Sequence, residues 1–196
     1  MRVIPKALAL MFIVSTLAAP LAAQGRGLKP VDNDGGDSQR GPWLLLGAGY
    51  GQEDYHFDGE EWSEPFRAPS LQIAAGGRVT DRFLVGLEWN VWADQEELTD
   101  QQLHAVSLIG MWYPVTRGLF FKGGFGLGID RIETVDGVFN DTGFGLTAGI
   151  GLDIPIARNI AILPKADLYI QNYNDPGQAN DFQERLFTLG LAVHFR

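Results

Sequence analysis

The sequence predicts an all-β protein, an eight-stranded antiparallel up-and-down transmembrane β-barrel, and three observations carry this prediction. Eight segments alternate bulky apolar residues with small or polar ones, and a period of two is typical of strands whose two faces meet different surroundings. Short turns and longer polar connections alternate between these segments, as in a barrel whose two ends face different compartments. The last segment stops almost at the final residue and places five apolar side chains on one face: Phe187, Leu189, Leu191, Val193 and Phe195.

Residues 1–23 have the pattern of a secretory signal peptide. Arg2 and Lys6 form a short basic region, an apolar run follows, and small residues lead to a cleavage site near Ala23. An N-terminal anchor helix is the alternative, but the run is too short to span a bilayer and it breaks at Pro20. Residues 24–41 are polar and aperiodic, which predicts a flexible periplasmic leader, and residues 42–196 form the predicted outer-membrane barrel domain.

Composition narrows the class further. No run of about 18 apolar residues follows the signal peptide, so no transmembrane helix is expected. The chain has no cysteine, so no disulfide framework stabilises the fold although the chain is exported. No Cys or His cluster indicates a transition-metal site, and no cofactor is expected. A net charge of −9 argues against nucleic acid as a partner.

The strands are expected in order at residues 43–55, 67–79, 82–93, 102–113, 118–131, 141–154, 160–173 and 185–196. Short turns are expected at 80–81, 114–117 and 155–159, and longer connections at 56–66, 94–101, 132–140 and 174–184. In the third strand, about ten residues at ~3.3 Å rise and ~40° tilt reach roughly 25 Å, the height of an outer-membrane apolar band. Both termini of the barrel then lie on the periplasmic side.

Aromatic residues near the strand ends predict two girdles at the membrane interfaces. The alternative is that they fill a soluble core. The expected periplasmic girdle contains Trp43, Phe83, Trp112, Tyr113, Phe120 and Phe195, and the expected outer girdle contains Tyr55, Trp89, Trp92, Tyr169 and Phe187.

Glycines decide which face of the barrel points inward. Gly124, Gly126 and Gly128 alternate with bulky apolar residues in the fifth strand, and the sixth strand repeats the pattern. An eight-stranded barrel has little interior room, so the glycine face fits the lumen and the apolar face must meet lipid. A lipocalin-like soluble barrel, with its apolar face inside, is therefore disfavoured.

Four charged residues fall on the inward face at similar heights: Glu88, Lys122, Lys165 and Asp167. Buried charges are costly unless they are paired, so a salt-bridged cluster that plugs the lumen is expected, with Arg78 and Asp153 lower down. An ion path is the alternative, which the narrow barrel and the balanced charges disfavour.

The longer connections are rich in acidic residues, with Arg131 as the one clear base among them. One interpretation is that these residues form a solvated rim. The functional alternatives are binding of a basic partner outside the cell, or binding of divalent cations that bridge to lipopolysaccharide phosphates. The acidic residues concerned are Glu53, Asp54, Asp58, Glu60, Glu61, Glu64, Asp94, Glu96, Glu97, Asp100, Asp130, Glu133, Asp136, Asp141, Asp175, Asp181 and Glu184.

The last strand, with Gly190 and Phe195, resembles the C-terminal assembly signal of small outer-membrane β-barrels, the OmpA transmembrane domain and the OmpX/Ail group. That family usually ends on an aromatic residue, whereas here Arg196 follows Phe195. The resemblance implies contact with outer-membrane lipid and lipopolysaccharide, recognition by the barrel-insertion machinery, and a monomer.

A structural or surface-interaction barrel without catalysis is the favoured function. A lipid-modifying hydrolase of the lipid A deacylase type is the alternative, and a small channel is a third. The sequence offers no catalytic residues for the hydrolase, because the neighbouring His104 and Ser107 point to opposite faces and His56 and His194 have no expected partners.

Overall fold

The computed structural model describes residues 41–57, 61–95, 99–115, 118–134, 137–173 and 182–196. They contain β1 (Pro42–Phe57), β2 (Phe66–Thr80), β3 (Phe83–Gln95), β4 (Thr99–Trp112), β5 (Gly118–Thr134), β6 (Gly137–Ala157), β7 (Ile160–Tyr173) and β8 (Phe182–Phe195). Among these residues no helix is long and apolar enough to cross a membrane. The predicted signal peptide and leader lie outside the described residues, apart from Gly41, so both stay predictions.

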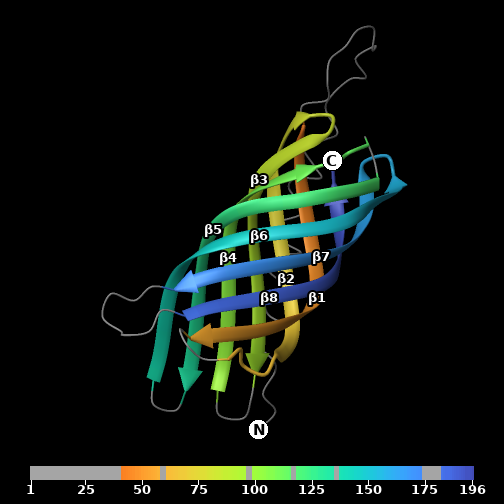
Figure 1. Cartoon of the computed structure of the whole chain (residues 1–196). Helices are drawn as coiled ribbons and strands as arrows, with labels where there is room; N and C mark the ends of the chain where they lie inside the picture. Colours follow the sequence, from red (N-terminus) through yellow and green to blue (C-terminus); the bar gives the residue numbers. More distant parts are fainter. Residues whose placement is uncertain (1–40, 58–60, 96–98, 116–117, 135–136, 174–181) are drawn as a thin grey trace, which may run out of the picture. The chain divides into compact units, whose positions relative to one another are not determined.

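The eight strands form one closed antiparallel barrel in which each strand pairs with its sequence neighbours. Figure 1 shows the orange β1 beside the dark blue β8, where the ring closes. That seam runs from Leu44 opposite Phe195 to Phe57 opposite Phe182. The predicted all-β, eight-stranded up-and-down barrel is therefore confirmed. Closure leaves no unpaired sheet edge, which a barrel in lipid requires.

Two of the four longer connections predicted at the outer end are wrong, whereas the strand bounds confirm the long intervals between β1 and β2 and between β7 and β8. β5 continues to Thr134 and β6 begins at Gly137, where a loop over 132–140 was expected. The interval between β3 and β4 is also shorter than the periplasmic interval between Trp112 and Gly118. The strands continue through polar residues here, because cross-strand hydrogen bonds pair the backbone N–H and C=O groups outside the lipid as well as inside it. At the periplasmic end, β6 runs through Pro155 to Ala157 with a shift in register, which is where a strand tolerates proline.

The side chains alternate as predicted, with the apolar face outward. Leu87, Phe125 and Leu127 are 62%, 53% and 55% exposed, whereas Glu88 between such positions is 2% exposed. The alternating glycines of both strands, Gly124, Gly126 and Gly128 of β5 and Gly143, Gly145, Gly149 and Gly151 of β6, lie on the lumen side, the same side as Lys122 and Thr147. The apolar outer surface is therefore the lipid-facing surface of the barrel.

Two apolar layers fill the lumen at different heights. The first contains Trp43, Leu45, Ala74, Leu84, Ile109, Met111, Tyr113, Phe120, Ala161, Leu163 and Ala192. The second contains Ala68, Trp92, Leu103, Ala105, Tyr169, Tyr173 and Leu186, with Phe66 and Phe182 packed against it. Burial of these side chains stabilises the barrel from inside, in addition to its contact with lipid.

The girdle prediction is wrong for five aromatic residues. Trp43, Tyr113, Phe120, Trp92 and Tyr169 are at most 4% exposed and belong to the lumen layers. Others of the expected set, such as Phe83, Trp112 and Phe187, do lie on the outer surface. The prediction used position along the strand and neglected which of the two faces each residue occupies, which the period of two decides.

Candidate functional site

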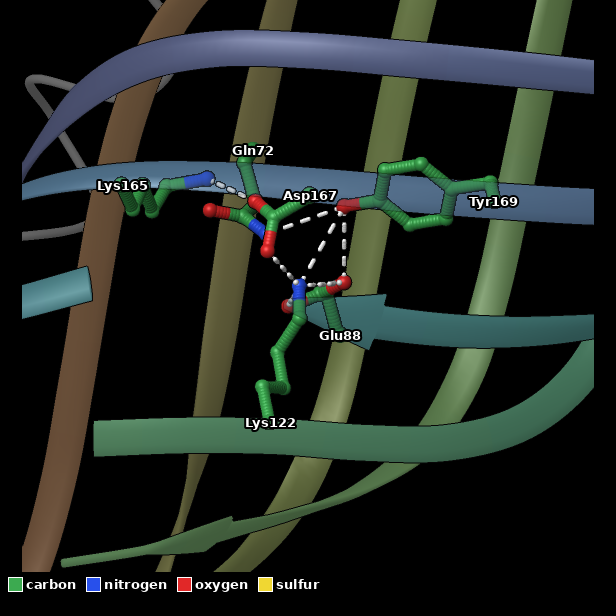
Figure 2. Close-up of polar contacts among 6 residues, drawn as sticks. All are labelled: Gln72, Glu88, Lys122, Lys165, Asp167 and Tyr169. Carbon is green, nitrogen blue, oxygen red and sulfur yellow. Dashed lines mark hydrogen bonds and ion pairs between the residues drawn. The ribbon is translucent and has the colours of Figure 1, made fainter. Parts of the chain in front are cut away.

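Four buried charges meet in the middle of the lumen, between the two apolar layers. Lys122 Nζ of β5 lies 2.8 Å from Glu88 Oε2 of β3 and 2.8 Å from Asp167 Oδ1 of β7. Lys165, also on β7, contacts the other oxygen of Asp167. The structure thus brings together all four residues of the predicted cluster, and Figure 2 shows Lys122 at its centre.

The strand register explains how Lys122 reaches Asp167 across an intervening strand. Lys122 pairs with Gly149 of β6, and Gly149 pairs with Asp167. A Cβ at Gly149 would lie 2.2 Å from Asp167 Oδ1 and 3.1 Å from Lys122 Cε. Because glycine has no side chain at position 149, the space is free for the ion pair between Lys122 and Asp167.

Two neutral residues complete the cluster, and the sequence reasoning missed both roles. Tyr169 donates its hydroxyl to Glu88 Oε1 at 2.9 Å, and Gln72 Nε2 donates to that hydroxyl oxygen at 3.1 Å. Lys122 Nζ also lies 5.2 Å from the centre of the Tyr169 ring. The signal that could have found Tyr169 is its spacing, two residues from Asp167 on the same face of β7.

The cluster is dry and electrically balanced. The side chains of Lys122, Glu88 and Asp167 are 3%, 1% and 1% exposed, and that of Lys165 is 7% exposed. Two lysines offset two carboxylates, and each charged group has a partner of opposite sign. A complete buried pair adds little net stability, but removing one member is strongly destabilising because the other charge is then left buried without a partner. This arrangement is suited to closing the lumen and to holding β3, β5 and β7 in one register.

A second polar cluster occupies the periplasmic end of the lumen. Asp153 Oδ2 of β6 accepts a hydrogen bond from Tyr113 Oη at 3.2 Å and faces His194 Nδ1 of β8 at 3.3 Å. Arg196 binds the other oxygen of Asp153. Arg78 and Asp153 both lie below the central cluster, as predicted, and they line the same cavity. The ion-pair partner of Asp153 is Arg196, and His194, for which no partner was expected, has this acidic neighbour.

Three acidic residues expected in the outer loops lie inside the lumen instead. Glu53, Asp130 and Glu184 are 0%, 3% and 2% exposed, on β1, β5 and β8. Neither carboxylate oxygen of Glu53 has a hydrogen-bond partner. The prediction assumed that charge implies solvent, but the strands extend beyond the lipid band and carry these residues on their inward faces.

At the outer end, Arg185 organises part of the first loop. Its guanidinium binds both oxygens of Asp54 at 2.9 and 3.0 Å and lies 3.2 Å from the centre of the Trp62 ring. Arg131 is therefore not the one base at this end. Asp54 is paired, whereas Glu61 and Glu64 are exposed to solvent.

None of the three histidines forms a catalytic triad within the described residues. His104 stacks on Trp89 with ring centres 6.0 Å apart, and His56 lies 5.0 Å from Trp62. His194 and Asp153 supply two members of a triad, but the cavity beside them is lined by no Ser, Thr or Cys. In the same part of the chain, no group of three His, Asp or Glu side chains is arranged to hold a metal ion.

The two residues of the predicted assembly signal lie on β8, the strand that closes the barrel. Phe195 is 36% exposed on the outer surface near the periplasmic end. Gly190 faces inward and pairs with Gly49 of β1. A Cβ at Gly190 would lie 2.6 Å from Ala48 O, so glycine allows the two strands to approach closely at the seam.

A closed barrel with lipid-facing apolar residues outside and a filled lumen inside defines the class of small outer-membrane β-barrels. The model of the family "Outer membrane protein beta-barrel domain" matches residues 7–195, and the chain belongs to this family. Its strands are therefore transmembrane strands in the cell outer membrane. A sequence search of the curated proteins found no match.

Solved structures show the same fold at low sequence identity. Ail, the attachment invasion locus protein of Yersinia pestis, is 15% identical with a TM-score of 0.55, covering 78% of this chain and 98% of Ail. Neisserial surface protein A is 14% identical with a TM-score of 0.57, covering 78% of this chain and 96% of the other. Ail in complex with the heparin analogue sucrose octasulfate gives 16% identity, a TM-score of 0.52 and coverage of 79% and 99%. The resemblance to the Ail group is thereby confirmed at the level of the fold.

Proposed function

We propose that the protein is a monomeric, non-catalytic barrel that serves as a structural and surface-interaction protein of the outer membrane, with a lumen closed by the Glu88–Lys122–Asp167–Lys165 cluster. The observation that carries the proposal is this buried, balanced cluster between two apolar layers, which closes the lumen and leaves the outer loops as the part of the barrel able to meet a partner outside the cell. We further propose export by the signal peptide with cleavage near Ala23, and insertion by the barrel-insertion machinery through Gly190 and Phe195.

The chemistry of the outer end favours a cationic partner. Glu61, Glu64 and Glu133 are exposed there, and the chain carries a net charge of −9. Ail has been solved with a polyanion, sucrose octasulfate, but an acidic surface repels polyanions. A basic extracellular partner, or divalent cations that link these carboxylates to lipopolysaccharide phosphates, therefore fits this chain better than a polyanion does.

Binding of fluorescent oligolysine to intact cells that display the protein tests this proposal. The triple variant Glu61→Gln, Glu64→Gln, Glu133→Gln should bind several-fold less, and the difference should shrink at high salt because exposed charges are screened. Asp81→Asn, which removes an exposed charge in the turn between β2 and β3 at the opposite end, is the matched control and should bind like the wild type. Equal binding by the triple variant would overturn the acidic-surface proposal.

The hydrolase alternative keeps one favourable observation, the buried Asp153–His194 pair at 3.3 Å. Purified protein refolded in detergent should release no fatty acid from lipopolysaccharide or phospholipid. Release that disappears in His194→Gln would establish the enzyme and reject the non-catalytic proposal.

A further inference from the structure

A cavity of about 160 Å³ opens at the periplasmic end of the barrel, below the first apolar layer. Three arginines line it, Arg78 from β2, Arg158 from the turn between β6 and β7, and Arg196 after β8. Trp43 and His194 are also on its wall. The arginines come from different sides of the ring, so they surround the space rather than form one exposed patch.

The arginines of this cavity are not all paired. Asp81 and Asp153 are the acidic side chains on its wall. Asp153 is already bound by Arg196, His194 and Tyr113. Arg78 and Arg158 have no ion-pair partner among the described residues. This contrasts with the central cluster, where every charge is paired, and with the acidic outer end.

A second polar group at the cavity also lacks a partner. His194 is 1% exposed and directs Nδ1 toward Asp153, and its Nε2 has no hydrogen-bond partner. This Nε2 atom is itself inaccessible from the cavity, so the free binding groups on the cavity wall are the side chains of Arg78 and Arg158.

We propose that this cavity binds a phosphate group, held chiefly by Arg78 and Arg158. Guanidinium groups bind phosphate with two parallel hydrogen bonds each, and such charge-assisted bonds are about twice as strong as neutral ones. A tetrahedral phosphate directs its oxygens to several sides at once and so meets arginines from different strands better than a planar carboxylate does. The phosphate belongs either to a free solute of the periplasm or to a lipid headgroup of the inner leaflet.

The test uses the refolded protein in maltoside micelles, which contain no phosphate. Inorganic phosphate is added stepwise at constant ionic strength, and a parallel series with potassium chloride is the control. The chemical shift of the Trp43 indole N–H is measured by NMR at each step. This group lies at the cavity, where it donates to Gly77 O at 3.3 Å, and Trp43→Phe assigns its resonance. The wild type should show a saturable shift that chloride does not produce.

The double variant Arg78→Gln, Arg158→Gln should bind phosphate about tenfold more weakly or not at all. Arg82→Gln is the matched control, because Arg82 is an exposed arginine at the same end that does not line the cavity. Each variant is first checked for folding by heat-modifiable gel migration. A linear shift in the wild type, or equal binding by the double variant, would overturn the proposal.

A second arm separates the two sources of phosphate. In phospholipid nanodiscs, a headgroup that occupies the cavity competes with inorganic phosphate and abolishes its saturable shift. A shift that persists unchanged in nanodiscs identifies a free phosphate compound as the ligand.

Discussion

At the scale of single residues, Lys122 has the most consequential position in the barrel. It joins carboxylates from two other strands, and its own side chain is 3% exposed. The ion pair between Arg131 and Glu133, by contrast, spans 3.6 Å with both side chains 47% exposed. Removing one partner of the buried Lys122 ion pairs leaves a charge that water cannot solvate, which is costly. Removing one partner of the exposed Arg131–Glu133 pair costs little, because water solvates the remaining charge.

Lys122→Met should lower the free energy of unfolding by about 3–5 kcal/mol, because it leaves Glu88 buried without a cation. Adding Glu88→Leu to that variant should recover part of the loss, since the uncompensated charge is then gone. Urea unfolding in lipid vesicles, followed by tryptophan fluorescence, measures both changes. Arg131→Met is the control and should change stability by less than about 1 kcal/mol. No recovery in the double variant would mean that the cluster contributes through packing alone.

Gly149→Ala tests the space that the Lys122–Asp167 pair occupies. The new Cβ would meet Asp167 Oδ1 at 2.2 Å, so the carboxylate must move and the barrel should lose about 1–3 kcal/mol of stability, as overpacked sites do. Gly145→Ala is the matched control on the same face of β6, where the nearest atom is 3.6 Å from the new Cβ. The same vesicle unfolding assay applies, and equal effects of the two variants would contradict the explanation.

Particular residues show how far the sequence could predict this site. Glu88, Lys122, Lys165 and Asp167 could be placed on the inward face because charge interrupts an otherwise apolar and glycine-rich alternation. Gln72 could not be assigned to the cluster, because a neutral side chain carries no such contrast, and for Tyr169 the one available signal was its spacing of two residues from Asp167. The prediction for Glu53 and Asp130 is wrong because polar residues indicate where the lipid band ends, whereas the strands continue beyond it and carry both side chains into the lumen.

At the scale of elements, β8 has two faces with separate tasks. Its inward face carries Gly190 at the seam and His194 at the periplasmic cavity. Its outward face carries Phe187 near the middle of the strand and Phe195 at its end, 46% and 36% exposed. The two phenylalanines expose comparable area to lipid, so a difference between them reports recognition during assembly rather than stability in the membrane.

Phe195→Ala should reduce the amount of protein in the outer membrane several-fold, while Phe187→Ala should not. Both lose similar lipid-facing area, about 1.5–3 kcal/mol of transfer free energy for a fully buried side chain, so stability alone predicts equal effects. Immunoblots of outer-membrane fractions at low expression give the comparison. Vesicle unfolding of the two refolded variants provides the control. Equal outer-membrane levels would remove Phe195 from the assembly signal.

At the scale of the whole molecule, the barrel is layered along its axis. From the periplasmic end, the arginine-lined cavity is followed by an apolar layer, the balanced ion cluster, a second apolar layer and the buried carboxylates. The charge also changes along this axis, from arginines at the periplasmic mouth to carboxylates at the outer end. Such layering separates the two mouths of the barrel from each other.

This layering predicts that the folded protein conducts no steady ion current. A permeating ion would have to pass Trp92, which is fully buried, and then separate Lys122 from Glu88 and Asp167. Breaking a buried pair of this kind typically costs about 3–5 kcal/mol, which would have to be supplied for every passing ion. Planar-bilayer recordings of the wild type should therefore show no stable open level.

Heat-modifiable gel migration of the same preparation establishes that the reconstituted protein is folded. A steady conductance that survives this control would replace the closed-lumen proposal with the channel alternative, and its loss or gain in Lys122→Met would then locate the ion path at the central cluster.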